Sequence, residues 1–167
     1  MHINTLVPDF ALPDLSGNIH HLDDYRGKIV IVNFCSAECP WSERADKNLM
    51  EISNRFSGQV VVLPVASNLN ETDEMINEAI HQRDISFVLR DVGCGLADLW
   101  QAQTTPHAFV IDQSGILRYR GAIDDVTFRK RTPERFYVVE AVAALMSGRL
   151  PEVQETSAYG CAIVRIL

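Results

Sequence analysis

One run of apolar residues, Ile29–Phe34, limits the fold of this chain more than any other feature. β-Branched residues dominate it and apolar side chains occupy both faces, which is typical of a strand covered on both sides of a sheet. A helical pattern of apolar residues follows over Pro40–Phe56, and a second run of the strand type, Val60–Val65, comes next. Strands separated by a helix predict a parallel pair joined by a right-handed crossover.

The other patterns extend this arrangement into a larger sheet. The order predicts an α/β fold of the thioredoxin type, with a mixed central β-sheet, helices on both faces and an N-terminal β-hairpin. The expected strands are one within Val7–Asn18, Ile19–Leu22, Ser86–Leu89, Ala108–Ile111 and Ile116–Tyr119, and the expected helices are Glu71–Gln82 capped by Asn70, Leu96–Gln101, and one from Pro133 to Met146 capped by Thr132.

The domain organisation is simple. We find no repeat, linker or low-complexity stretch, and 167 residues suit one domain, 1–167. Residues 149–167 form a C-terminal tail, and its polar segment Pro151–Ser157 is expected to be loosely held. The tail contains Cys161, one of the four cysteines of the chain.

Charge excludes several kinds of partner. Fifteen basic and twenty-two acidic side chains give a net charge of −7, which argues against binding to nucleic acid or to an anionic membrane. The longest apolar runs fall far short of the roughly 20 residues that span a bilayer. The N-terminal residues lack the basic and apolar regions of a secretory signal, so a cytoplasmic location is expected.

The segment after the first buried strand carries the chemistry. Proline is favoured at the first position of a helix, so Pro40 makes Cys39 the N-cap. The free N–H groups and the positive end of the helix dipole favour a thiolate there, and the thiolate is the nucleophilic form of cysteine. We expect an exposed Cys39 with a pKa below the reference of about 8.5, although Glu38 and Glu43 oppose this shift.

The partner of Cys39 in a disulfide cycle is open. A dithiol site has its second cysteine three residues on, where this chain has Ser42, so the resolving thiol lies elsewhere or on another molecule. Cys35 is near in sequence, but four extended residues span roughly 13 Å and a tight turn would be needed. Cys161 and Cys35 are equal candidates, and Cys94 ranks below them.

Several short motifs together resemble a known family. They resemble the redoxin group of the thioredoxin superfamily, also called the alkyl hydroperoxide reductase/thiol-specific antioxidant family, over almost the whole chain. These motifs are Pro8-Asp9-Phe10-x-Leu12, Gly17, Tyr25-Arg26-Gly27-Lys28, Cys39-Pro40, and Thr105-Pro106 before Phe109-x-Ile111-Asp112 and Gly115. Positions similar to one subgroup with a Cys-Pro-aromatic motif are Arg118, Arg120, Asp124, Asp125, Glu155-Thr156 and Gly160-Cys161.

The resemblance implies a thiol-dependent oxidoreductase without a cofactor. Cys39 matches the redox nucleophile, Pro106 matches the cis-proline that packs against the active sulfur, and His107 would lie beside the thiol. The expected partner is a thiol or disulfide, such as a thioredoxin-type donor or a small thiol.

Departures from the family pattern separate two activities. Peroxiredoxins carry Pro-x-x-x-Thr-x-x-Cys, and the matching residues here are Val32, Ser36 and Cys39, so Ser36 would have to supply the hydroxyl. Their arginine, which stabilises the developing charge on peroxide, aligns with Pro106. Thiol–disulfide exchange is therefore preferred, and peroxide reduction is the alternative.

Two other functions use the same residues differently. Cys35-x-x-x-Cys39-Pro40 has the spacing of Sco-type copper chaperones, and His107 would complete a set of two thiolates and an imidazole that suits copper. The simpler interpretation is that Cys35 replaces an aromatic residue common in redoxins. A binding module that kept the fold without redox activity is the remaining possibility.

Overall fold

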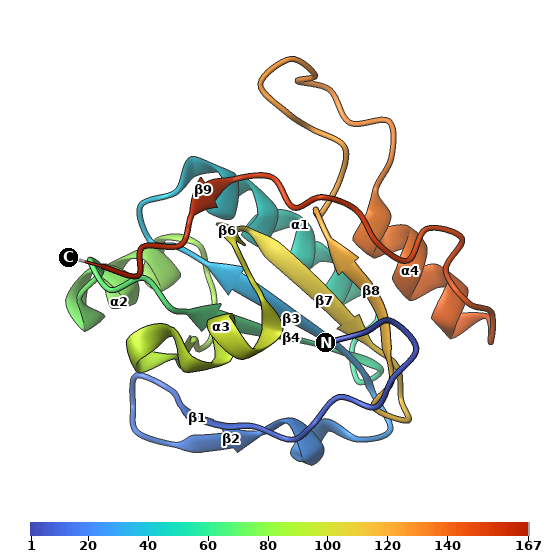
Figure 1. Cartoon of the computed structure of the whole chain (residues 1–167), viewed down its shortest axis with the longest axis horizontal. Helices are drawn as coiled ribbons and strands as arrows, with labels where there is room; N and C mark the ends of the chain where they lie inside the picture. Colours follow the sequence, from blue (N-terminus) through green and yellow to red (C-terminus); the bar gives the residue numbers. More distant parts are fainter. Residues whose placement is uncertain (167) are drawn as a thin grey trace.

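A computed structural model describes residues 1–166 and has a five-stranded mixed sheet at its centre (Figure 1). The strand order is β5-β4-β3-β7-β8, in which β3, β4 and β5 are parallel and β7 and β8 are antiparallel to their neighbours. The α/β fold of the thioredoxin type is thereby confirmed. The strands are β3 (Ile29–Cys35), β4 (Val60–Ala66), β5 (Leu89–Arg90), β7 (His107–Ile111) and β8 (Leu117–Gly121).

The sheet divides the core into two layers. Strand β3 contributes to both layers, because alternate side chains of a strand point to opposite faces of a sheet. Val30, Val32 and Phe34 pack on the face that α3 (Gly95–Trp100) and the N-terminal hairpin cover. Ile29 and Ile31 pack on the other face. The hairpin strands are β1 (Ala11–Pro13) and β2 (Ile19–His21), and the helices on the second face are α1 (Pro40–Arg55) and α4 (Tyr137–Met146) (Figure 1).

Two helices begin later than the sequence predicts. Helix α2 spans Asp73–Gln82, and its N-cap is Thr72, whose hydroxyl accepts the Met75 N–H at 3.3 Å. Asn70 is therefore not the cap. The strand expected over Ser86–Leu89 is likewise displaced, since β5 comprises Leu89–Arg90.

Helix α4 begins at Tyr137 instead of Pro133 because the preceding residues close a long loop. The Asp125 N–H donates to the Arg135 carbonyl at 3.2 Å, and the Asp125 carboxylate accepts the Glu134 N–H at 2.9 Å. These two hydrogen bonds across the loop thus replace the first helical turn that the capping pattern predicts.

The C-terminal tail is not loose, which corrects the expectation for Pro151–Ser157. It runs along β8, where the Arg120 N–H donates to the Gln154 carbonyl at 3.0 Å and the Thr156 N–H donates to the Arg120 carbonyl at 3.1 Å. Farther on, strand β9 (Cys161–Ala162) pairs antiparallel with β6 (Thr104–Thr105), so the tail crosses the top of the molecule (Figure 1). Ile163 then enters the core.

Two glycines allow the tail to lie this close. A Cβ on Gly160 would be 2.1 Å from the Thr105 carbonyl oxygen and 3.0 Å from the Pro106 ring. A Cβ on Gly121 would be 2.2 Å from the Thr156 hydroxyl oxygen and 2.5 Å from the Thr156 carbonyl oxygen. Any larger residue at either position would push the tail away from the sheet.

We expect Gly160→Ala to lower the free energy of unfolding by about 1–3 kcal/mol, the usual cost of overpacking, because the obstructing atoms belong to the backbone. Thermal unfolding would measure the loss. Gly95→Ala is the matched control, since its Cβ would meet only the Asp91 side chain at 3.8 Å and Gly95 has helical backbone angles. Equal stability of the two variants would show that Gly160 does not set the tail position.

Candidate active site

Cys39 is the N-cap of helix α1, as the sequence predicts. It has extended backbone angles, with φ −87° and ψ 118°, and Pro40 occupies the first turn. The expectation that the sulfur is exposed is wrong, because only 2% of the residue is accessible. The covering atoms include those of strand β9, so the tail shields the sulfur.

The tail brings a second thiol to Cys39. The two sulfur atoms of Cys39 and Cys161 are 2.7 Å apart, and the Cys39 sulfur lies 3.1 Å from the Thr105 carbonyl oxygen. Both thiols are free, and Cys161 is the exposed member of the pair. Thr105 faces Cys161 in the β6–β9 ladder and precedes a cis peptide bond to Pro106. The cis-proline that the family resemblance implies is therefore present beside this pair.

The environment makes Cys39 the more acidic of the two thiols. Burial raises the pKa of Cys39, but the Cys161 thiol and the backbone amides of Ser42, Cys161 and Trp41 lower it, and the net pKa lies below its ordinary value. Burial and the neighbouring Cys39 raise the pKa of Cys161 to about 11. The arrangement favours a Cys39 thiolate that accepts a hydrogen bond from the Cys161 thiol.

We expect Cys161→Ala to raise the pKa of Cys39, because the variant removes the S–H donor that stabilises the thiolate. Absorbance of the thiolate at 240 nm, followed against pH and corrected with a Cys39→Ser protein, measures this shift. Cys161→Ser is the matched control, since its hydroxyl still donates. An unchanged Cys39 titration in Cys161→Ala would contradict this account of the pair.

The other two cysteines lie apart from this pair. Cys35 is buried against Ala66 and Ile76, and its thiol donates to the Val65 carbonyl at 3.5 Å. Burial and the carboxylates of Asp46 and Glu71 raise the pKa of Cys35 well above its ordinary value.

Cys94 is also buried, and its thiol donates to the Ser67 carbonyl at 3.0 Å. Of the three cysteines considered as resolving thiols, the structure brings only Cys161 to Cys39.

Ser36 and Ser42 serve the loop before Cys39 rather than the sulfur itself. The Ser42 hydroxyl oxygen accepts the Ser36 N–H at 3.1 Å, and the Ser36 hydroxyl donates to the Glu71 carboxylate. Neither hydroxyl forms a hydrogen bond with Cys39 among the contacts of residues 1–166. Ser36 is therefore occupied and does not fill the role of the peroxiredoxin threonine.

His107 does not hydrogen-bond to either sulfur in the described part of the chain. Its ring stacks on Phe109 with centroids 4.7 Å apart, and it lines a polar cavity with Arg120 and Glu155. Pro106 lines a different cavity, because successive side chains of an extended segment point to opposite sides. Burial and the charge of Arg120 lower the pKa of His107 to about 4.

The copper set proposed from spacing is not assembled. Cys35, Cys39 and His107 each have different neighbours, and within residues 1–166 no three histidine, cysteine or acidic side chains are grouped as metal ligands. The same described residues also contain no helix that combines the length and apolarity needed to cross a bilayer.

Sequence reasoning missed the side chain that supports the Cys39 loop. One Arg83 amino group donates to the Ser36 carbonyl and to Asp46, both at 2.9 Å, and the other donates to the Ala37 carbonyl. Burial raises the pKa of Asp46 to about 6 despite the charge of Arg83. Nothing in the sequence joins a residue at the end of α2 to this loop, because only the fold brings them together.

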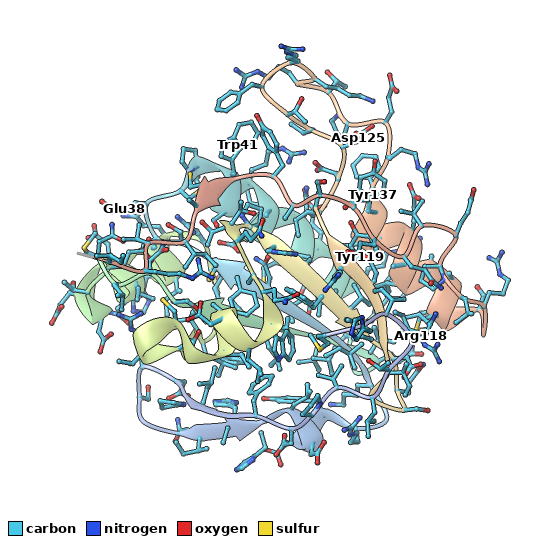
Figure 2. The ribbon with its side chains drawn as sticks, viewed as in Figure 1. Glu38, Trp41, Arg118, Tyr119, Asp125 and Tyr137 are labelled. Carbon is cyan, nitrogen blue, oxygen red and sulfur yellow. The ribbon has the colours of Figure 1, made fainter. Side chains whose placement is uncertain are left out.

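The charged subgroup positions have structural partners. The Arg118 guanidinium donates to Asp112 at 2.7 Å, and that of Arg120 donates to Glu155 of the tail at 2.7 Å. In the loop after β8, Asp124 pairs with Arg44 of α1, and Asp125 pairs with Lys130 of the same loop. Figure 2 labels Arg118 and Asp125.

Three aromatic side chains form a cluster near the cysteine pair. Trp41 follows Pro40, Tyr159 precedes Gly160, and Phe128 comes from the loop after β8. Their rings meet edge to face, with centroids 5.2 Å apart for Trp41 and Tyr159, 5.3 Å for Trp41 and Phe128, and 5.7 Å for Phe128 and Tyr159. Trp41 is the aromatic residue of the Cys-Pro-aromatic motif, but nothing in the sequence brings Phe128 and Tyr159 to it, so this cluster was not predicted.

Comparison with known protein families identifies the family of this chain. The model of the AhpC/TSA family matches residues 3–120. The chain belongs to this family. The match ends before the tail, so the family pattern covers Cys39 and Pro106 but not Cys161.

The chain is also similar to individual proteins. The thiol-disulfide oxidoreductase ResA of Geobacillus kaustophilus is 29% identical over 114 residues, which are 68% of this chain and 65% of ResA. The crystal structure of a hypothetical protein from Sinorhizobium meliloti has a TM-score of 0.87 at 25% identity, covering 98% of this chain and 94% of that one. An uncharacterised conserved protein from Geobacillus kaustophilus gives 0.86 at 23%, covering 98% and 92%. The two structures share the fold at nearly full length.

Proposed function

We propose that this protein is a thiol–disulfide oxidoreductase whose redox pair is Cys39 and Cys161. The observation that carries the proposal is the 2.7 Å separation of the two sulfur atoms beside Pro106. Similarity to ResA supports the same class of reaction. The sequence separation of 122 between the two cysteines is no obstacle, because the β6–β9 pairing already holds Cys161 in place.

The reaction needs two exchange steps. The Cys39 thiolate attacks one sulfur of a substrate disulfide, forms a mixed disulfide, and releases the other sulfur as a thiolate that takes up a proton. The Cys161 thiolate then attacks the Cys39 sulfur, forms the Cys39–Cys161 disulfide, and releases the substrate's second thiol. Two electrons pass from the protein to the substrate, and an external thiol, such as a thioredoxin-type donor or a small thiol, reduces the protein again.

The coupling between the two thiols suits this order of steps. The Cys39 thiolate is one reason why the pKa of Cys161 is high. Once Cys39 is in a mixed disulfide, that negative charge is gone, so the pKa of Cys161 falls and the second attack becomes easier. Access to Cys39 requires β9 to shift, and β9 is a pair of exposed residues held by one short ladder.

The peroxide alternative has less support. The Ser36 hydroxyl is engaged by Glu71, and Arg44, near Pro106 in the same cavity, is paired with Asp124. Neither group is available to bind and polarise peroxide beside Cys39. Stopped-flow oxidation by hydrogen peroxide no faster than that of free cysteine would agree with disulfide exchange.

We expect one equivalent of hydroxyethyl disulfide to produce a Cys39–Cys161 disulfide and to leave Cys35 and Cys94 reduced. Mass mapping after proteolysis identifies the linked peptides. Cys161→Ser should stop at the mixed disulfide on Cys39, because no thiol remains to resolve it, whereas the control Cys94→Ser should behave as the unmodified protein does. Cys39 linked to any cysteine other than Cys161, or full turnover by Cys39→Ser, would refute the proposed pair.

A further inference from the structure

The loop between β8 and α4, residues 124–136, is the most prominent feature that the proposed chemistry does not use. It projects from the body of the molecule, and Figures 1 and 2 show it rising next to the tail, with Asp125 in it. We call it the basic loop because residues 129–131 are Arg-Lys-Arg, in a chain whose net charge is −7.

The basic loop is attached to both segments that carry the redox cysteines. Asp124 forms a salt bridge with Arg44 of α1, in the first turns after Cys39. The Phe128 N–H donates to the Tyr159 hydroxyl at 2.8 Å, two residues before Cys161. The ring of Phe128 also packs on Trp41. The loop therefore stands at the rim of the site in a defined position.

The tip of the basic loop presents an apolar surface and positive charge together. Phe128 is 67% exposed, although an aromatic side chain gains free energy when it is covered. Arg129 and Arg131 are exposed and form no salt bridge within residues 1–166, and Arg131 lies over the Phe128 ring. Lys130, by contrast, is neutralised by Asp125 and Glu134.

The charge around the site is polarised, which gives a partner a preferred orientation. Glu38 and Glu43 are exposed on the loop before α1 and on its first turn, and Glu43 pairs with Lys47 of α1 at 3.6 Å. Figure 2 places Glu38 farther from the basic loop than Trp41 is. Glu38 thus places negative charge on one side of the cysteine pair, and the loop tip places positive charge on the other side.

We propose that the basic loop docks an acidic protein segment that carries an apolar side chain next to the disulfide exchanged with Cys39. This inference rests on the proposed function and names the class of its partner. The apolar side chain covers Phe128, while carboxylates pair with Arg129 and Arg131. Charge complementarity at the rim also accelerates the encounter, by about tenfold or more at low ionic strength.

Two synthetic peptides test this proposal. Both contain leucine beside a cysteine activated as a 2-thiopyridyl disulfide, and they differ only in carrying two glutamates or two lysines. Attack by Cys39 on the peptide sulfur releases 2-thiopyridone, whose absorbance gives the rate. We expect the acidic peptide to react about tenfold faster at low salt, and the ratio to approach one near 1 M salt, where the Debye length is about 3 Å.

Charge reversal at the tip provides the decisive variant. Arg129→Glu combined with Arg131→Glu should invert the preference between the two peptides. The control carries the same change in net charge at Arg55 and Arg149, which are exposed and lie outside the loop. Phe128→Ala should slow both peptides alike, because an apolar contact does not distinguish their charges.

The outcomes separate this inference from the proposed function. Equal rates for the two peptides, or a control as effective as the tip variant, overturn the docking proposal even if hydroxyethyl disulfide still reacts. Failure of hydroxyethyl disulfide to react refutes the proposed function itself. Tip-dependent binding of a short single-stranded oligonucleotide, with peptide rates that ignore charge, would assign the tip to nucleic acid and also overturn the proposal.

Discussion

The pairing of β9 with β6 is the interaction on which the site depends. It sets Cys161 opposite Thr105 and holds its sulfur against that of Cys39. Gly160 is required for this pairing, because a Cβ there would collide with the Thr105 carbonyl. A contact between two backbone segments therefore decides which thiol lies next to Cys39.

The rest of the fold supports this contact from both sides. The tail is fixed before β9 by Arg120 and Glu155 and after it by Ile163 in the core. The loop before Cys39 is fixed by Arg83, which satisfies two carbonyl groups and one carboxylate. Both sulfurs are thus held in position by groups other than the two thiols, which lowers the entropic cost of bringing them together.

The sequence predicted the helices and strands that form through interactions between residues close together in the chain. The buried strand at Ile29–Phe34 and the helix after Pro40 follow from apolar spacing and from proline at a helix start. The start of α4 could not be predicted, because the hydrogen bonds that Asp125 makes across the basic loop outweigh the local capping pattern at Thr132. The position of His107 could not be predicted either. Side chains alternate along the extended segment, so His107 and Pro106 line different cavities, and the His107 ring points away from Cys39.

The sequence by itself determined the thioredoxin-like order of elements, the cysteine at the start of a helix, and the serine at position 42 in place of a second cysteine. Only the tertiary structure shows which cysteine lies beside Cys39, because Cys35 is four residues away in the sequence and Cys161 is 122 residues away. Strand β3 points the Cys35 side chain into the core, whereas β9 returns the distant residue to the helix start. The direction and pairing of the strands decide which thiols come close together. The number of residues between two cysteines does not reveal this.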